Sequence, residues 1–329
     1  MVEKTQWKSS SAFILAMIGA AVGLGNIWRF SYVVYSNGGG SFFIPYLIAI
    51  AIMGIPFLIL EYGMGFSFKD SFSNTLKRIN PKLEYISWIL LLFVFIVVLY
   101  YMVILSWDLV YLGSSFTFQW GSDAALTGTP MVQLVSKGTG LIFIVFPMIF
   151  NIMGLAGRIL APLLFIAILF AGISSAVAIF EPMVSSIENK LDWTRKKTVT
   201  VLSVIGCLLS LIFTTGISSY LVGVVDVFVN EFGVLLLIAI QCIIFTWIYD
   251  VDSLIPILNE NSRFKVGKTW KFIIKYVLPF VLIIMWLIRI IHLFEDADSF
   301  EITVDIIIMA VVLVFGVIFT KIKPKGELK

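Results

Sequence analysis

The residues best suited to chemistry lie in the first apolar run, where Gly19, Gly23 and Gly25 precede Asn26 and Arg29. Three glycines so close together would cost a continuous helix about 2 to 3 kcal/mol relative to alanine. The spacing of Gly19 and Gly23 alone also fits a face on which two membrane helices pack closely. Gly25 breaks that spacing, and Arg29 carries a permanent charge that is costly in a membrane. Because a packing face requires neither residue, the pattern favours a helix that is unwound at its middle.

An unwound helix would offer two kinds of backbone group to a ligand. Its freed carbonyl oxygens can coordinate a cation, and the amides that begin its second half can face an anion. The side chain of Asn26 adds an oxygen directly after the glycines. Two more oxygens, the hydroxyls of Ser174 and Ser175, lie in a distant apolar run. These hydroxyls could instead bond to carbonyls of their own helix, so the serines alone leave both interpretations open.

The elements that position these residues must be membrane helices. Of the 329 residues, 60% are hydrophobic and 13% are charged, whereas soluble domains carry about 25% charged residues. Apolar runs of about 20 residues, which is enough to cross a bilayer as a helix, recur along the chain. We predict an all-α polytopic membrane protein with eight spans, at about residues 11–35, 41–66, 84–107, 159–181, 198–219, 221–249, 273–293 and 302–320.

A ninth apolar run, at about residues 140–156, is short and contains Pro147 and Gly154. Such a run suggests a broken or re-entrant element. If it does not span, most of the 23 Lys and Arg residues fall on one side of the membrane. Because cytoplasmic loops are enriched in Lys and Arg, we predict an outer re-entrant hairpin at about residues 131–157. Both termini of this multi-pass protein are then expected in the cytoplasm, with the first run a span of the cell membrane and not a removable signal peptide.

Several classes of function are not expected from this composition. Cys207, Cys242 and His292 are the whole Cys and His inventory, and none is near another in sequence. A zinc or iron–sulfur site, a disulfide framework and a Cys/His nucleophile pair are therefore disfavoured. The basic residues cluster in loops, which indicates membrane topology and no nucleic-acid partner. Since no His, Cys or paired acids converge at one depth, we do not expect an enzyme.

Residues 7–66, which include the glycine-rich stretch, resemble the first two helices of the neurotransmitter:sodium symporter family. The likeness is to its prokaryotic amino-acid transporter branch, with the leucine-transporter-like fold. The segment FAGISSAVAIFEP at 170–182 resembles the family's eighth helix. Residues 84–112 resemble its third helix, and residues 198–320 resemble its ninth to twelfth.

The resemblance jumps between Leu126 and Thr127. Family members have about twelve spans, so the likeness implies a chain that lacks the equivalents of helices four to seven. It implies one transmembrane domain over residues 1–329, in which 1–126 correspond to helices one to three, 127–157 to the outer hairpin and 158–329 to helices eight to twelve. The absent sixth helix is the broken counterpart of the first in the family's inverted repeats.

The resemblance further implies two sodium sites. The first lies between the carbonyls of Gly19 and Val22 and, across from them, the carbonyl of Ala171 with the hydroxyls of Ser174 and Ser175. The second uses the carbonyl of Ala21 and the side chain of Asn26. Sodium is therefore the expected bound ion.

A substrate site and a gate are implied in the same way. Ala21, the amides around Leu24 and Gly25, and the Tyr101 hydroxyl resemble the clamp on a substrate carboxylate. Val97, Ser175 and Ile179 match positions that line the family's side-chain pocket, and Arg29 with Asp226 match its outer gate. Taken singly, Tyr101 also fits an ordinary helix–helix hydrogen bond, Val97 and Ile179 also fit a plain core, and Arg29 with Asp226 also fit a structural pair.

The predicted function is sodium-coupled symport of a small neutral amino acid by alternating access, in a shortened form that transports poorly. Its expected partners are that amino acid, sodium and membrane lipid. The alternative is a non-transporting membrane scaffold or partner subunit that keeps part of the fold.

Overall fold

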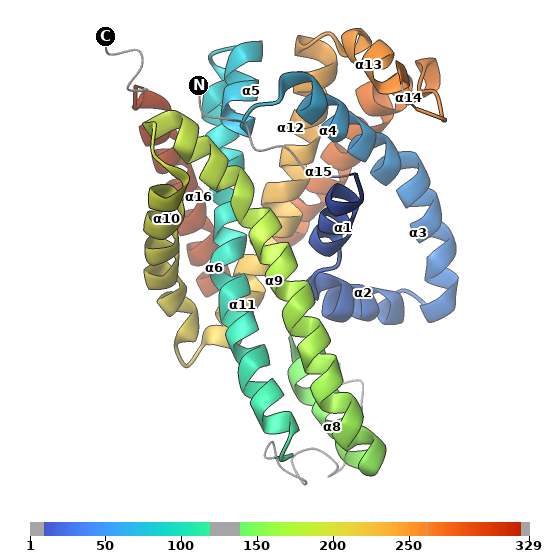
Figure 1. Ribbon diagram of the computed structural model, residues 1–329, viewed down its shortest axis with the longest axis vertical. Coiled ribbons are helices and arrows are strands. Elements are labelled where there is room, and N and C mark those ends of the chain that lie inside the picture. Colours follow the sequence, from blue (N-terminus) through green and yellow to red (C-terminus); the bar gives the residue numbers. More distant parts are fainter. Residues whose placement is uncertain (1–9, 119–138, 261, 324–329) are drawn as a thin grey trace. The chain divides into compact units, whose positions relative to one another are not determined.

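The computed structural model describes residues 10–118, 139–260 and 262–323 (Figure 1). Every regular element within these ranges is a helix, as predicted. Seven helical stretches of the described residues are long and apolar enough to cross a membrane: Gly39–Phe68, Leu83–Ser115, Leu155–Leu191, Arg195–Thr214, Ser218–Ile248, Lys268–Ile291 and Ser299–Lys321. These seven stretches correspond in order to the second to eighth predicted spans.

The first predicted span, residues 11–35, is covered by two short helices, α1 (Ser10–Ala21) and α2 (Leu24–Ser36). With 12 and 13 residues, each is shorter than the roughly 20 residues of helix that cross a bilayer. Figure 1 shows the two helices running in different directions on either side of a short break.

Prolines account for three places where α-helix gives way to π-helix. The π-helical turns η2 (Ile50–Gly54), η3 (Leu141–Val145) and η8 (Ile273–Val277) each end two residues before a proline. Proline has no amide hydrogen and therefore removes one donor from the helical ladder. The ladder instead closes over five residues, as when the Leu278 amide donates to the Ile273 carbonyl. Such turns leave carbonyls that side chains can occupy.

The described helices fall into two compact units. The first unit holds the described residues of Met1–Gly40, Val98–Glu181 and Gly206–Ser219. It contains α1, α2, the second half of α6 (Leu83–Ser115), η3, α8 (Phe146–Ile152), most of α9 (Leu155–Leu191) and η4 (Leu211–Thr214). Aromatic contacts join these elements, for example between Trp107 and Phe143 and between Tyr111 and Phe165.

Within this unit α8 turns back along the start of α9 (Figure 1). Gly154 adopts a left-handed conformation at the turn, with a φ of 57°. A Cβ atom on Gly157 would lie 2.0 Å from the Phe150 carbonyl oxygen, so only glycine allows this close approach. Together η3 and α8 form an apolar helix over Leu141–Ile152, which is too short to cross a bilayer.

The second unit holds Ser41–Val97, Pro182–Ile205 and the described residues of Tyr220–Lys329. Its helices include the following: η1 (Gly39–Phe42), which begins at the boundary, α3 (Phe43–Ala49), η2, α4 (Ile55–Phe68), α5 (Phe72–Ile79), most of α10 (Arg195–Ser210), most of α11 (Ser218–Val227), η5 (Phe228–Val234), α12 (Leu235–Ile243), η6 (Ile244–Ile248), η7 (Val251–Ser253), α13 (Leu254–Glu260), α14 (Lys268–Phe272), η8, α15 (Leu278–Asp296) and α16 (Ser299–Lys321). A buried apolar core joins α4, α12 and α15 through residues such as Leu60, Cys242 and Leu282.

Candidate functional site

The break between α1 and α2 leaves several backbone groups without helical partners. Gly23 is extended, with φ −112° and ψ 176°. The Val22 amide still donates to Ile18, and the next helical bond is the one from the Asn26 amide to the Gly23 carbonyl. The last carbonyls of a helix have no donors within it. The carbonyl oxygens at the end of α1 are therefore available to other groups.

Two serines of α9 occupy that position. The Ser174 Oγ atom lies 2.8 Å from the Gly19 carbonyl oxygen and 2.9 Å from the Ala171 carbonyl oxygen of its own helix. The Ser175 Oγ atom lies 3.2 Å from the carbonyl oxygens of Ala20 and Val22. Ser175 is 2% exposed. Oxygens from two segments that are far apart in sequence thus converge at the end of α1.

Tyr101 of α6 meets the same break from another side. The Leu24 amide, the first of α2, donates a hydrogen bond to the Tyr101 hydroxyl at 3.1 Å, and both residues are buried. A Cβ atom on Gly23 would lie 3.0 Å from the Ser175 Oγ atom and 3.3 Å from the Tyr101 hydroxyl. Gly23 therefore permits the close packing of this tyrosine and serine against the backbone.

Asn26 folds back onto the end of α1. Its Nδ2 atom lies 2.6 Å from the Ala21 carbonyl oxygen. Gly25, between the two, is half-buried. The Ala21 carbonyl and the Asn26 side chain are therefore neighbours.

The sequence matches one known protein family. A sequence model of the sodium:neurotransmitter symporter family matches residues 4–125 and 120–319, which is most of the chain. The chain belongs to the sodium:neurotransmitter symporter family. The family consists of sodium-dependent transporters and not of enzymes.

Two relatives from this family illustrate the extent of the likeness. An uncharacterized sodium-dependent transporter of Methanocaldococcus jannaschii is 26% identical over 439 aligned residues, covering 85% of this chain and 89% of that protein. The sodium- and chloride-dependent neutral and basic amino acid transporter B(0+) of Mus musculus is 38% identical over 150 residues. That alignment covers 43% of this chain and 23% of the mouse protein, so the chain spans about a quarter of that relative's length.

The fold is also found in a solved structure. The crystal structure of MhsT in complex with L-phenylalanine superposes with a TM-score of 0.72 and 21% sequence identity. The superposition covers 86% of this chain and 99% of that chain.

The chain is a shortened form of this family. The alignment with the archaeal transporter runs over 439 residues, which exceeds the 329 residues of the chain itself. Part of the relative therefore lies opposite gaps. The family match falls into two pieces that meet at residues 120–125, next to the interruption predicted after Leu126. The shortened form predicted from the sequence is thus confirmed.

The remaining predicted residues lie on α2, α6, α9 and α11. Ile179 is half-buried on α9, one turn beyond Ser175. Val97 is half-buried on α6 but belongs to the second unit. Arg29 lies on α2 in the first unit, while Asp226 lies on α11 in the second, where its carboxylate accepts a hydrogen bond from the Asn230 amide at 2.9 Å. The symporter gate proposed for Arg29 and Asp226 stays a prediction.

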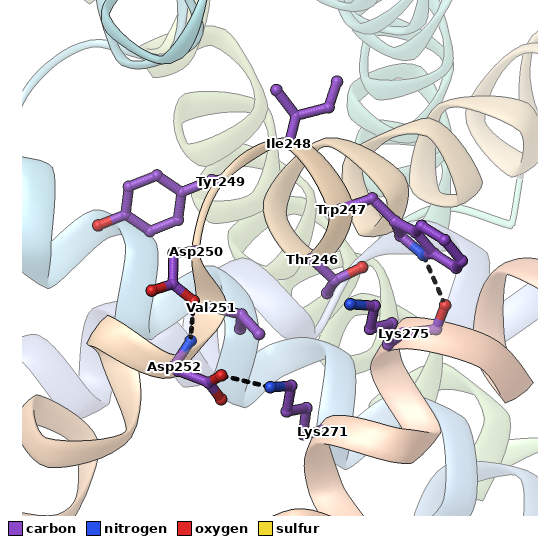
Figure 2. Close-up of a pocket in the computed structure, with 9 residues that line it drawn as sticks. All are labelled: Thr246, Trp247, Ile248, Tyr249, Asp250, Val251, Asp252, Lys271 and Lys275. Carbon is purple, nitrogen blue, oxygen red and sulfur yellow. Dashed lines mark hydrogen bonds and ion pairs between the residues drawn. The ribbon is translucent and has the colours of Figure 1, made fainter.

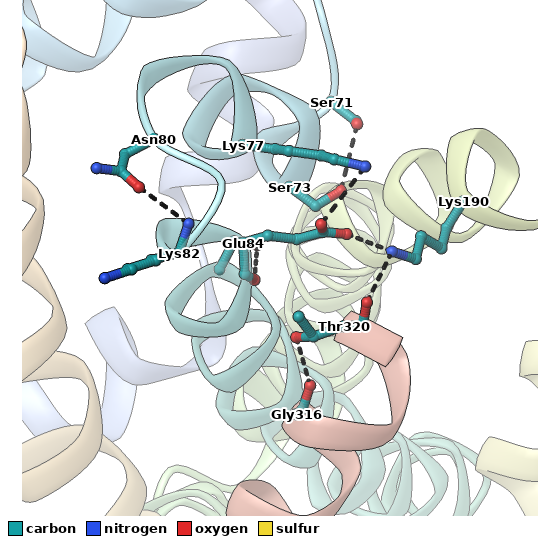
Figure 3. Close-up of polar contacts among 10 residues, drawn as sticks. Ser71, Ser73, Lys77, Asn80, Lys82, Glu84, Lys190, Gly316 and Thr320 are labelled. Carbon is teal, nitrogen blue, oxygen red and sulfur yellow. Dashed lines mark hydrogen bonds and ion pairs between the residues drawn. The ribbon is translucent and has the colours of Figure 1, made fainter. Parts of the chain in front are cut away.

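A buried ion pair in the second unit was missed by the sequence analysis. Lys190 lies in the last turn of α9 and is 4% exposed. Its ammonium group contacts the Glu84 carboxylate at the start of α6, and the Thr320 carbonyl of α16 lies 3.4 Å away (Figure 3). Lys77 of α5 lies 3.6 Å from the other oxygen of Glu84. These contacts therefore join four helices, which a count of charged residues in the sequence does not reveal.

Proposed function

We propose that this protein binds sodium and a small neutral amino acid at the break between α1 and α2, and couples their movement across the membrane. The observation that carries the proposal is the approach of the Ser174 and Ser175 hydroxyls to carbonyls at the end of α1. A serine that served only its own helix would not reach a backbone break more than 150 residues away in sequence.

The donor set at this break fits sodium. Gly19, Val22 and Ala171 supply carbonyl oxygens, and Ser174 and Ser175 supply hydroxyl oxygens. Hard cations prefer oxygen ligands, and backbone carbonyls can replace the hydration shell of a monovalent ion. Each hydroxyl can turn its hydrogen away and direct a lone pair to the cation. In the described part of the chain no cluster of three or more His, Cys, Asp or Glu side chains could hold a metal ion, so neutral oxygens are the matching ligands here.

A second sodium ion is proposed at Ala21 and Asn26. The side-chain amide of Asn26 already lies against the Ala21 carbonyl. An asparagine amide presents an oxygen after a half-turn, so the same pair can offer two oxygens to a cation.

The amino-acid substrate is proposed to lie with its carboxylate at the start of α2. The Leu24 and Gly25 amides and the Tyr101 hydroxyl are donors for it, and the helix dipole favours an anion at this position. The pocket residues Val97, Ser175 and Ile179 carry no charge, and a charged substrate side chain without a partner is costly to bury. A neutral amino acid therefore fits best. The amino-acid transporter among the relatives and the L-phenylalanine bound to MhsT support this substrate class.

Transport is proposed to occur by alternating access in a cell membrane. The seven long helical stretches and the broken pair α1 and α2 together supply eight spans, with both termini cytoplasmic and residues 1–329 acting as one transmembrane domain. Arg29 and Asp226 would close the outer path as an intramembrane pair. Because the equivalents of helices four to seven are absent, the second sodium site and the substrate pocket lose part of their walls. We expect sodium binding to persist and transport to be slow.

Uptake by proteoliposomes tests this function. With an inward sodium gradient, the protein should take up labelled neutral amino acids faster than with a potassium gradient, but far more slowly than a twelve-span relative. Tyr101→Phe should weaken sodium-dependent amino-acid binding, while Tyr35→Phe, a change on an exposed ring of α2, should not. If no neutral amino acid binds in a sodium-dependent way, a non-transporting scaffold is the better description. Uptake as fast as that of a twelve-span relative would contradict the expectation that the shortened form transports slowly.

A further inference from the structure

A cavity of about 250 Å³ lies in the second unit, where the chain leaves η6 and passes α14 and η8. Residues Thr246–Asp252 form one wall, and Lys271 and Lys275 form the other. Figure 2 shows both lysine side chains entering from one side and both aspartates, Asp250 and Asp252, from the opposite side. None of the residues of the proposed sodium and amino-acid sites lines this cavity.

The lysine wall is held in place at a backbone carbonyl that lacks its α-helical amide donor. Pro279 lies four residues after Lys275, so the Lys275 carbonyl has no α-helical donor. The indole Nε1 of Trp247 donates to this carbonyl at 3.0 Å (Figure 2). This bond holds the Trp247 ring beside the Lys275 side chain, whose Nζ atom lies 4.9 Å from the ring centroid and 5.9 Å from that of Tyr276. Two aromatic faces thus hold one ammonium group at the cavity.

Two of the four charged side chains that line the cavity form an ion pair with each other, and the other two do not. Lys271 forms an ion pair with Asp252. Within the described ranges neither Lys275 nor Asp250 has an ion-pair partner, although the Asp250 Oδ1 atom accepts the Asp252 amide at 3.1 Å. One open cation and one open anion therefore line the same small space. Such a pair matches a ligand that carries one negative and one positive group.

The cavity lies where lipid headgroups are expected. Trp247 is the penultimate residue of the apolar stretch Ser218–Ile248, and Lys275 lies two turns into the stretch that begins at Lys268. Tryptophan and tyrosine favour membrane interfaces, and lysine extends its charge to the headgroups while its stem stays in apolar surroundings.

An apolar surface for lipid tails continues from the cavity. Phe272, Tyr276 and Phe280 follow one another at four-residue spacing, which places them along one side of the helix. Their side chains are 57%, 47% and 67% exposed. The cavity itself is smaller than the roughly 300 to 1,000 Å³ of sites for drug-sized ligands, so it suits a headgroup and not a whole lipid.

We propose that this cavity binds the headgroup of phosphatidylethanolamine. The phosphate contacts the Lys275 ammonium, the primary ammonium of the headgroup donates to the Asp250 carboxylate, and the acyl chains lie along Phe272, Tyr276 and Phe280. A lipid with a quaternary ammonium cannot donate hydrogen bonds to Asp250, and an anionic lipid without an ammonium leaves Asp250 opposed to a like charge.

Lipid titrations of the purified, delipidated full chain test this assignment. Native mass spectrometry should show phosphatidylethanolamine binding about tenfold tighter than phosphatidylcholine or phosphatidylglycerol with the same acyl chains, a difference of about 1.4 kcal/mol. Soluble glycerophosphoethanolamine, which keeps the phosphodiester and ammonium charges without the acyl tails, should bind at least about tenfold more weakly. Equal binding of the three lipids, preference for phosphatidylglycerol, or equal binding of soluble glycerophosphoethanolamine would overturn the proposal.

Two substitutions localise the effect. Lys275→Gln and Asp250→Asn should each reduce phosphatidylethanolamine binding about tenfold, and Lys275→Arg should retain most of it. Lys268→Gln and Glu260→Gln remove equivalent charges from residues that do not line the cavity and should leave binding unchanged. Matching losses in the site and control variants would contradict a specific site. Because Asp250 is exposed, Asp250→Asn should not impair folding. It therefore still tests the site if Lys275→Gln does impair folding.

Discussion

The Ser174 Oγ atom of α9 lies 2.8 Å from the Gly19 carbonyl oxygen of α1, across 155 residues of sequence. The same hydroxyl lies 2.9 Å from the Ala171 carbonyl oxygen of its own helix. One serine therefore contacts both of the backbone segments whose carbonyls are proposed to hold sodium. This relationship ties the broken first helix to an intact helix of the same unit.

Gly23 is predicted to tolerate no larger residue. In Gly23→Ala the new methyl group would press on the Ser175 Oγ atom at 3.0 Å and on the Tyr101 hydroxyl at 3.3 Å. Overpacking of this kind costs about 1 to 3 kcal/mol. Thermal unfolding of the purified protein should show the loss, together with weaker amino-acid binding. Gly113→Ala in α6, where a Cβ atom has no neighbour within 4 Å, should not destabilise the protein; similar effects at both positions would contradict the packing described here.

The buried pair of Glu84 and Lys190 is predicted to be costly to break from one side. Glu84→Gln leaves the Lys190 ammonium, which is 4% exposed, without its carboxylate, and such a loss costs about 3 to 5 kcal/mol. The double variant Glu84→Leu with Lys190→Met should recover much of that stability because no buried charge is left alone.

The surface pair of Arg195 and Glu188 provides the comparison for this experiment. The side chain of Arg195 is 59% exposed, and exposed pairs contribute only about 0 to 1 kcal/mol. Arg195→Met should therefore change the unfolding temperature little. A loss in Glu84→Gln no larger than that in Arg195→Met would show that the buried pair is not needed for stability.

The stability of the fold is predicted to fall in acid because of Asp298, which lies just before α16. The amide of Glu301, the hydroxyl of Tyr220 and the amide of Phe300 donate to its carboxylate and lower the pKa of Asp298. Since the folded pKa lies below the unfolded value of about 3.9, the ionised group stabilises the fold above that pH. The contribution is lost as the pH falls through the folded pKa.

Asp298→Asn isolates this contribution. Asparagine keeps an oxygen to cap α16 but does not titrate, so the fall in unfolding temperature below about pH 4 should become shallower. Tyr220→Phe removes one of the donors and should weaken the acid dependence in part. An unchanged acid profile in Asp298→Asn would exclude Asp298 as its source.

Hydropathy predicted much of the fold because a membrane span needs a long apolar run whatever it packs against. The seven long helical stretches lie where the second to eighth spans were expected. Loop charges predicted less about packing. Lys190 is one of the 23 basic residues in that count, yet it is buried against Glu84. A pairing between residues 106 positions apart leaves no local pattern in the sequence.

The candidate site was predictable in part. The glycines of the first run indicated a weak point in the helix, and the structure places the break between Ala21 and Leu24. Residue types alone left Ser174 and Ser175 with two interpretations, because a hydroxyl can serve its own helix or another. The contact of Ser174 with both Gly19 and Ala171 combines them. The pairing of Arg29 with Asp226 depends on the arrangement of the two units and stays a prediction.

Sodium-dependent thermal stabilisation tests the central claim most directly. A ligand that binds only the folded state at 100 times its dissociation constant stabilises it by about 2.7 kcal/mol, so saturating sodium chloride should raise the unfolding temperature above that in choline chloride of equal ionic strength. Ser174→Ala combined with Ser175→Ala should abolish this rise. Ser185→Ala, whose hydroxyl bonds to the Pro182 carbonyl of the same helix, should keep it. A sodium effect that survives in the double variant, or is missing in the unaltered protein, would contradict a sodium site at the broken helix.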